Sequence, residues 1–394
     1  MILIKKFINY AGFSALTTFF GLLTLPVLTA FLAPSEYGIL GVTLSFLALL
    51  LPFSTLSNQQ NVQVTKTKEG RAEYSHFWDS LCSLVLILAC SLFCVVCIAV
   101  YFNKFPSVFL LIPILSLVRA LRLLKQAELT VIDKDFLFGL STLLISVFAF
   151  FTTFGIFYFI EATAMIRIAC LAFAELLVVF CVLKFRFNFV YSPRVFKQIY
   201  NVGLPLIIST LPAWLINEAS RIFILNYHSL ELVGVYTLAF QISVIYLQFN
   251  TALGNTFVKK IFNDISILSS KKFIFQVSLI QLVCALIFVL LLVFFGKSVL
   301  PVSYGAAIPI ATILTFGVLL QSFGLLPTYY FSYHKVNRFR LYALSVAAVI
   351  ATVLNYIYIP KYGIDGAAFI FVVSMAFYSA CLFFFVVFYS NKVN

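Results

Sequence analysis

A small number of charged residues lie within otherwise apolar segments of the sequence, where a charge needs a partner or a polar cavity. Arg119 and Arg122 are three residues apart, so a helix presents them on one face. Guanidinium groups bind phosphate through paired hydrogen bonds, and such a pair suits an anionic ligand. Glu175 must be protonated or paired in this environment, and we expect it to pair with Arg119. Glu218 and Arg221, also three apart, form a second candidate substrate-binding set.

Several of these charges also have a purely structural interpretation. Arg122 can extend along its helix to place its guanidinium at the inner membrane surface. Arg119 lies about 18 Å from the outer end of its segment, a little past the midplane, so we expect it to face a cavity. Glu218 and Arg221 can neutralise each other as an ion pair. Arg167, near the outer end of its segment, can reach the outer headgroups.

The segments that carry these residues are long enough to cross a membrane. Hydrophobic residues make up 63% of the chain and charged residues 10%, whereas about 25% of a soluble domain is charged. One crossing takes about 20 residues of helix. We therefore expect an all-α polytopic membrane protein with about twelve transmembrane helices. These spans are predicted over residues 7–32, 37–57, 77–101, 107–127, 139–159, 165–183, 200–224, 233–256, 273–295, 306–330, 341–359 and 367–388.

Lysine and arginine are distributed unevenly between the two sides of these spans. When both termini are placed inside, twenty Lys and Arg residues fall on the inner side, against Lys104, Lys297 and Lys361 outside. Positive residues concentrate on the cytoplasmic side of membrane proteins, so we expect both termini to be cytoplasmic. The same distribution accounts for the net charge of +13, and we expect no nucleic-acid partner.

Cysteine and histidine do not indicate a metal or redox site. All eight cysteines lie inside the apolar spans, where cysteine is typical of a small hydrophobic residue. The three histidines lie singly in loops, without the spacing of metal ligands. We therefore predict no metal site, no cofactor and no catalytic residue.

The two halves of the chain begin with similar motifs. Residues 9–12 (NYAG) are echoed by 200–203 (YNVG), and residues 36–40 (EYGIL) by 232–236 (LVGVY). Two six-helix repeats of the same orientation imply a pseudo-two-fold axis along the membrane normal. We expect one six-helix lobe over residues 1–190 and a second over residues 191–394, with the basic inner loop between them.

Motifs along the whole chain resemble those of one transporter family. The segments are Ala33–Gly38 at the first outer turn, Gly203-Leu204-Pro205, Ser220-Arg221, Gly234–Ala239, and Ile359–Ala368 at the last outer turn. They resemble polysaccharide flippases of the Wzx type, which serve O-antigen or capsule synthesis. These flippases belong to the multidrug/oligosaccharidyl-lipid/polysaccharide exporter superfamily. The family commonly carries Asp before the arginine of span seven. Here that position is Ser220, and the nearest acid is Glu218.

The resemblance implies a transporter of the bacterial inner membrane. Its expected cargo is a polyprenyl-diphosphate-linked oligosaccharide repeat unit, moved between the lobes by alternating access. Membrane lipids and other polysaccharide-assembly membrane proteins are the further expected partners. An antiporter of cationic drugs is an alternative within the superfamily, although such a protein needs unpaired acids in its spans. A membrane-embedded glycan polymerase or acyltransferase is a further alternative, which the short outer loops disfavour.

Overall fold

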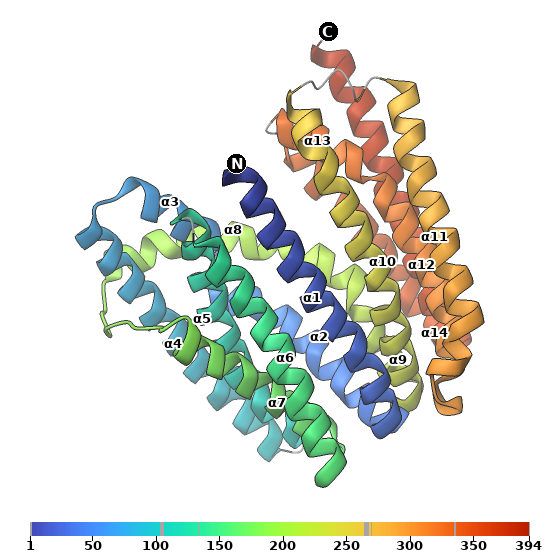
Figure 1. Cartoon of the computed structure of the whole chain (residues 1–394), viewed down its shortest axis with the longest axis horizontal. Coiled ribbons are helices and arrows are strands. Elements are labelled where there is room, and N and C mark those ends of the chain that lie inside the picture. The colour runs from blue at the N-terminus through green and yellow to red at the C-terminus, as the bar shows by residue number, and fades with distance from the viewer. Residues whose placement is uncertain are drawn as a thin grey trace. The chain divides into compact units, whose positions relative to one another are not determined.

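The computed structural model describes residues 2–102, 106–132, 134–263, 268, 270–334 and 336–393, with their secondary structure in helices and connecting turns. Figure 1 shows their course through the chain. The α-helices are α1 (Ile2–Phe31), α2 (Pro34–Thr55), α3 (Gln59–Lys68), α4 (Arg71–Tyr101), α5 (Leu111–Val131), α6 (Asp135–Phe159), α7 (Ala164–Leu177), α8 (Pro193–Asn217), α9 (Ala219–Tyr227), α10 (Leu230–Asn263), α11 (Lys271–Val299), α12 (Ala307–Phe323), α13 (Leu325–Tyr333) and α14 (Arg338–Val393). Shorter helical turns precede α5 and α12, and a π-helical turn, Val178–Val182, extends α7.

The expected polytopic all-α membrane fold is confirmed. Within the described residues, ten helical segments are long and apolar enough to cross a membrane, and a shorter apolar helix covers Ala15–Phe31. The longest segment, α14, contains Gly363 with φ of +54°, a conformation that favours glycine. This bend separates the eleventh and twelfth predicted spans. The predicted spans therefore coincide largely with helix, with turns at Glu218 in the seventh and at Gly324 in the tenth.

The seventh predicted span, over residues 200–224, is not one continuous helix. Helix α8 ends at Asn217, and α9 begins at Ala219 after a break at Glu218. The sequence has no glycine or proline at this break, which explains why the pattern predicted a single helix. The segment after α2, which lies between two predicted spans, contains the short polar helix α3.

The chain divides into two compact units. Unit 1 comprises Met1–Leu32 and Val42–Thr210, and unit 2 comprises Ala33–Gly41 and Leu211–Asn394. Helix α2 and helix α8 each contribute residues to both units. The division into lobes at residue 190 concerns the sequence repeat and stays a prediction.

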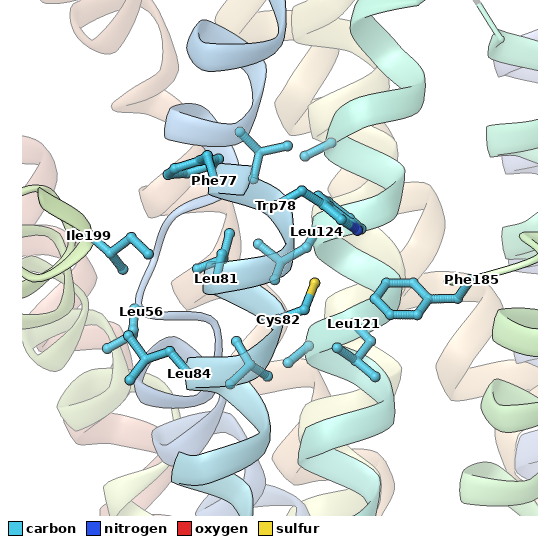
Figure 2. Packing of buried hydrophobic residues seen from close by; sticks show 14 of the residues in the cluster. Leu56, Phe77, Trp78, Leu81, Cys82, Leu84, Leu121, Leu124, Phe185 and Ile199 are labelled. Carbon is cyan, nitrogen blue, oxygen red and sulfur yellow. The ribbon is translucent and has the colours of Figure 1, made fainter. Parts of the chain in front are cut away.

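The core of unit 1 lies where α4 packs against α5. Figure 2 shows Trp78 and Cys82 of α4 pointing toward α5, with Leu121 and Leu124 of α5 opposite. In water, burial of such a side chain stabilises a fold by roughly 1.5–3 kcal/mol. Between helices in lipid, close van der Waals packing provides the stabilisation instead.

The basic segment after α7 is held against this core by hydrogen bonds to α4. The Trp78 indole donates to the Arg186 carbonyl at 3.3 Å, and the Asn188 amide donates to Asp79 at 3.0 Å. The Val190 amide donates to the Ser83 hydroxyl at 2.9 Å. These bonds satisfy backbone groups that have no helical partner, so the segment is fixed to the N-terminal half of α4.

In unit 2, the start of α2 packs against α10 by close approach of their backbones. A Cβ atom on Gly38 would overlap the carbonyl oxygen of Leu230, and one on Gly234 would overlap that of Pro34. Gly38 and Gly234 are equivalent in the sequence repeat and lie 196 positions apart. Pro34 and Leu230, whose carbonyl groups they approach, are also 196 positions apart. Gly41 faces Thr237 with the same offset. A reciprocal contact of this kind is what a local two-fold axis between the two motifs produces.

Candidate functional site

The described structure brings three of the predicted site residues together in unit 1. The Nε and Nη2 atoms of Arg119 lie 2.7 and 2.6 Å from Oε1 of Glu175. The Nε atom of Arg122 lies 3.3 Å from Oε2 of the same carboxylate. The predicted pairing of Arg119 with Glu175 is confirmed, and Arg122 shares the partner. The three residues form what we call the arginine site.

The helices place the arginine site by their sequence spacing. Arg119 and Arg122 lie about one turn apart on α5, so both guanidiniums reach toward α7. Glu175 lies in the last turn of α7, next to the π-helical turn at Val178–Val182. Such turns insert one residue into a helix and often accompany functional sites. The carboxylate is thereby presented to two guanidiniums of a neighbouring span.

Polar side chains extend the arginine site from α5 to α6. The Nη1 atom of Arg122 donates to Oε1 of Gln126 at 2.9 Å, and Nε2 of Gln126 donates to the Ser141 hydroxyl at 2.8 Å. The Ser141 hydroxyl in turn donates to the Phe138 carbonyl at 2.7 Å. Gln126 and Ser141 are buried. Their bonds hold the Arg122 side chain in place and link three spans.

The arginine site carries a net positive charge. Two guanidiniums share one carboxylate, and the Glu175 side chain is 1% exposed, against 23% for Arg119 and 14% for Arg122. A guanidinium has five N–H donors, and contacts within the described residues use two of its nitrogens on each arginine. Arg119 is the more accessible of the two cations.

Glu218 and Arg221, the other predicted pair, lie at the beginning of α9 in unit 2. Nη1 of Arg221 contacts Oε2 of Glu218, three residues before it. The guanidinium also lies over the Phe240 ring of α10, 4.9 Å from its centroid. The pair forms the expected local ion pair, and its charges balance. Ser220 binds Asn355 of α14 through Oγ and Oδ1 at 3.3 Å.

Arg167 does not extend to a membrane surface in this structure. Its side chain is buried and donates to the Thr153 hydroxyl at 2.6 Å and to the Ala149 carbonyl at 3.1 Å, both on α6. Charge-assisted bonds of this kind connect α7 to α6. The headgroup interpretation of Arg167 was therefore wrong.

One charged cluster was not recognised in the sequence. Glu128, near the C-terminal end of α5, contacts Lys66 of α3 at 2.9 Å and Lys125 of α5 at 2.5 Å. The three-residue spacing of Lys125 and Glu128 was a readable signal for a pair within one helix. The contribution of Lys66 depends on α3, which forms outside the predicted spans. Within the described residues, no group of three or more His, Cys, Asp or Glu side chains is placed to hold a metal ion.

Comparison with known families decides the class of the chain. The family model described as "Polysaccharide biosynthesis protein" matches residues 27–266, which is more than half of the sequence. The chain belongs to this family. The family is consistent with the resemblance of the sequence motifs to polysaccharide exporters. A search of curated proteins finds no significant match.

Solved structures with a similar fold are transporters. This chain resembles the lipid II flippase MurJ in an inward closed conformation. The TM-score is 0.77 and the sequences are 14% identical, over 95% of this chain and 87% of that one. It also resembles an inward-facing multidrug resistance MATE family transporter of the MOP superfamily, with a TM-score of 0.68 and 15% identity over 94% and 93%. A third similar structure is the MATE multidrug transporter DinF-BH, with a TM-score of 0.62 and 14% identity over 98% and 96%. At these identities the likeness concerns the fold alone, and it agrees with the expected all-α polytopic architecture.

Proposed function

We propose that the protein is a flippase that moves a polyprenyl-diphosphate-linked oligosaccharide repeat unit across the bacterial inner membrane by alternating access. The observation that carries this proposal is the net positive arginine site, in which Arg119 and Arg122 share the buried Glu175. Membership in a polysaccharide biosynthesis family supports a glycan cargo. The fold of a lipid II flippase supports a lipid-linked one.

In this proposal, the arginine site recognises the diphosphate, the group that all such substrates share. Guanidinium groups donate paired, charge-assisted hydrogen bonds to phosphate oxygens. Glu175 orients both guanidiniums before the substrate arrives, so less side-chain freedom is lost on binding. The carboxylate also offsets part of the positive charge, which keeps the binding weak enough for release. The polyprenyl tail remains in lipid while the sugar crosses.

The same proposal places both termini in the cytoplasm and the basic inner loops beside the leaflet where the substrate is made. The distribution of lysine and arginine supports this orientation. Other membrane proteins of polysaccharide assembly are proposed as partners because the product must be passed on after transport. The proposal involves no cofactor.

A drug antiporter is the second candidate, because MATE transporters share the fold. A cationic cargo calls for acids that are available in the spans. Here Glu175 contacts two arginines, and Glu218 contacts Arg221. Positive charge therefore exceeds negative charge at the arginine site, which favours an anionic cargo.

The test replaces Arg119 with Ala and with Lys in cells that depend on this protein for surface glycan. We expect the Ala variant to lose surface glycan and to accumulate lipid-linked oligosaccharide on the cytoplasmic face. The Lys variant keeps the charge but lacks the guanidinium fork, so we expect partial function. Arg340→Ala is the matched control, since Arg340 is exposed near the start of α14. Normal glycan from a well-expressed Arg119→Ala variant would exclude the phosphate-binding role.

A further inference from the structure

A second cationic cluster lies about one turn further along α5 than the arginine site. Glu128 binds two ammonium groups, with Oε1 2.9 Å from Nζ of Lys66 and Oε2 2.5 Å from Nζ of Lys125. Lys66 comes from α3, so the cluster also links the inner segment after α2 to the span. We call Lys66, Lys125 and Glu128 the lysine cluster.

Two aromatic rings of α4 hold the ammonium groups of the lysine cluster in place. Nζ of Lys66 lies 4.0 Å from the centroid of the Tyr74 ring, and Nζ of Lys125 lies 5.3 Å from that of Trp78. Both rings are buried in the core of unit 1. A cation over an aromatic face is attracted by the ring quadrupole. Each flexible lysine is therefore fixed by a carboxylate oxygen and by a ring before any ligand binds.

The exposure of the three side chains is unequal in a way that favours an anion. The Glu128 side chain is 8% exposed, whereas those of Lys66 and Lys125 are 28% and 24% exposed. Each ammonium has three N–H donors, and its bond to Glu128 uses one. A ligand that approaches from the open side meets two ammonium groups with the carboxylate behind them. The cluster carries one positive charge more than a simple ion pair.

The spacing along α5 connects the lysine cluster to the arginine site. Arg119, Arg122 and Lys125 follow one another at intervals of three residues, so each cation lies about 4.5 Å further along the helix axis. Lys125 is the innermost of the three in the orientation proposed above. A phosphoryl group leaving the inner surface would meet the lysine cluster first and the arginine site next.

We propose that the lysine cluster binds a lipid-borne phosphoryl group and receives the diphosphate of the substrate before the arginine site does. This inference rests on the proposed function for the identity of the carrier. Phosphate oxygens match the chemistry of two closely held ammonium groups. The same chemistry is present in the headgroup of an anionic phospholipid, so the experiment must separate the two sources.

The first test compares binding of polyprenyl diphosphate and of phosphatidylglycerol to the purified full chain in nanodiscs of neutral lipid. The triple variant Lys66→Gln, Lys125→Gln, Glu128→Gln removes all three charges together and leaves no buried charge without a partner. We expect it to bind polyprenyl diphosphate about tenfold more weakly or worse, as loss of charge-assisted bonds implies. Lys68→Gln is the matched control, because it removes an exposed charge from the same helix outside the cluster.

A single substitution separates ligand binding from a structural tie. Glu128→Gln keeps both lysines and removes the negative charge behind them, so we expect several-fold tighter phosphoryl binding. A merely structural cluster would instead lose thermal stability, with affinity unchanged or reduced. This measurement also decides the question if the triple variant fails to fold.

The outcomes identify both the ligand and the proposal that fails. Weaker binding of polyprenyl diphosphate by the triple variant supports the inference with the carrier as ligand, and weaker binding of phosphatidylglycerol alone supports it with phospholipid as ligand. Unchanged binding of both probes overturns the inference, while a wild-type chain that still transports its cargo leaves the proposed function standing. A wild-type chain that binds no polyprenyl diphosphate contradicts the proposed function itself.

Discussion

In unit 1, helices α5, α6 and α7 are joined by charged and polar side chains, whereas in unit 2 the start of α2 meets α10 through its backbone. Arg122 in unit 1 takes part in bonds that reach both Glu175 and, through Gln126, Ser141. Gly38 and Gly234 in unit 2 have no side chain, and the two backbones approach each other closely as a result. Membrane helices associate through both kinds of contact, polar side chains and closely packed small residues, because the hydrophobic effect does not bring helices together in lipid.

This comparison also shows where charge is available for a ligand. The charges of unit 1 are shared across helices and leave a positive excess at the arginine site. Glu218 and Arg221 in unit 2 balance each other within one helical turn. A balanced local pair has no excess charge for an anion, so we expect the two charged sites to respond differently to substitution.

Glu175→Gln is expected to have the largest effect. The substitution leaves two largely buried guanidiniums without a counter-charge, a change that costs about 3–5 kcal/mol when a buried ion pair is broken. We expect a much lower thermal unfolding temperature and little folded protein in the membrane. Measurement of thermal unfolding in detergent checks this, with Glu175→Asp as the control that keeps the charge. Unchanged stability of Glu175→Gln would show that the two arginines have other sufficient partners.

Gly38→Ala tests the backbone contact of unit 2. The new Cβ would overlap the Leu230 carbonyl oxygen, which is backbone and cannot move aside as a flexible side chain would. Overpacking of this kind typically costs about 1–3 kcal/mol. We expect reduced thermal stability together with reduced transport, and the same for Gly234→Ala.

The chain offers a matched control for the glycine substitutions. Gly155 lies within α6, and a Cβ there would meet nothing within 4 Å. Gly155→Ala should therefore be neutral or slightly stabilising, since alanine favours helix over glycine by about 1 kcal/mol. Equal effects of Gly38→Ala and Gly155→Ala would refute the close approach of α2 and α10.

The spans and one contact of the arginine site could be predicted from the sequence. Apolar length indicates a membrane helix directly, because each span satisfies its backbone bonds within itself. The pairing of Arg119 with Glu175 followed from two isolated charges near the midplane of the same half. The participation of Arg122 depends on how α5 and α7 are rotated, which the spacing within one helix does not determine.

Contacts between distant polar residues were beyond sequence reasoning. Gln126 and Ser141 are ordinary residues for a membrane helix, and nothing in their types indicates that they bind each other. Lys66 contacts Glu128 from α3, a polar helix that lies outside the predicted spans and that their apolar pattern does not indicate. The reciprocal packing of Gly38 and Gly234 had a sequence signal, the repeat with an offset of 196, but the repeat gave no contact distance.

Glu218→Gln is expected to have a smaller effect than Glu175→Gln. Among the described contacts, Glu218 pairs with Arg221, which also lies over the Phe240 ring. Loss of one charge-assisted bond costs about 1–3 kcal/mol. We expect a moderate fall in thermal stability, with surface glycan retained because the arginine site is intact. Complete loss of glycan at normal expression would instead place this pair in the transport path.

Ser141→Ala should have the smallest effect and tests how far the polar connection of unit 1 extends. The substitution removes the Ser141 hydroxyl that accepts from Gln126 at 2.8 Å, so the buried amide loses one partner. A neutral hydrogen bond contributes about 1 kcal/mol net. Gln126 still accepts from Arg122, so we expect transport close to that of the wild type and a small fall in unfolding temperature. A double-mutant cycle with Gln126→Ala measures the coupling directly. A coupling energy near zero would mean that Ser141 does not help to position Arg122, and that the polar connection from the arginine site ends at Gln126.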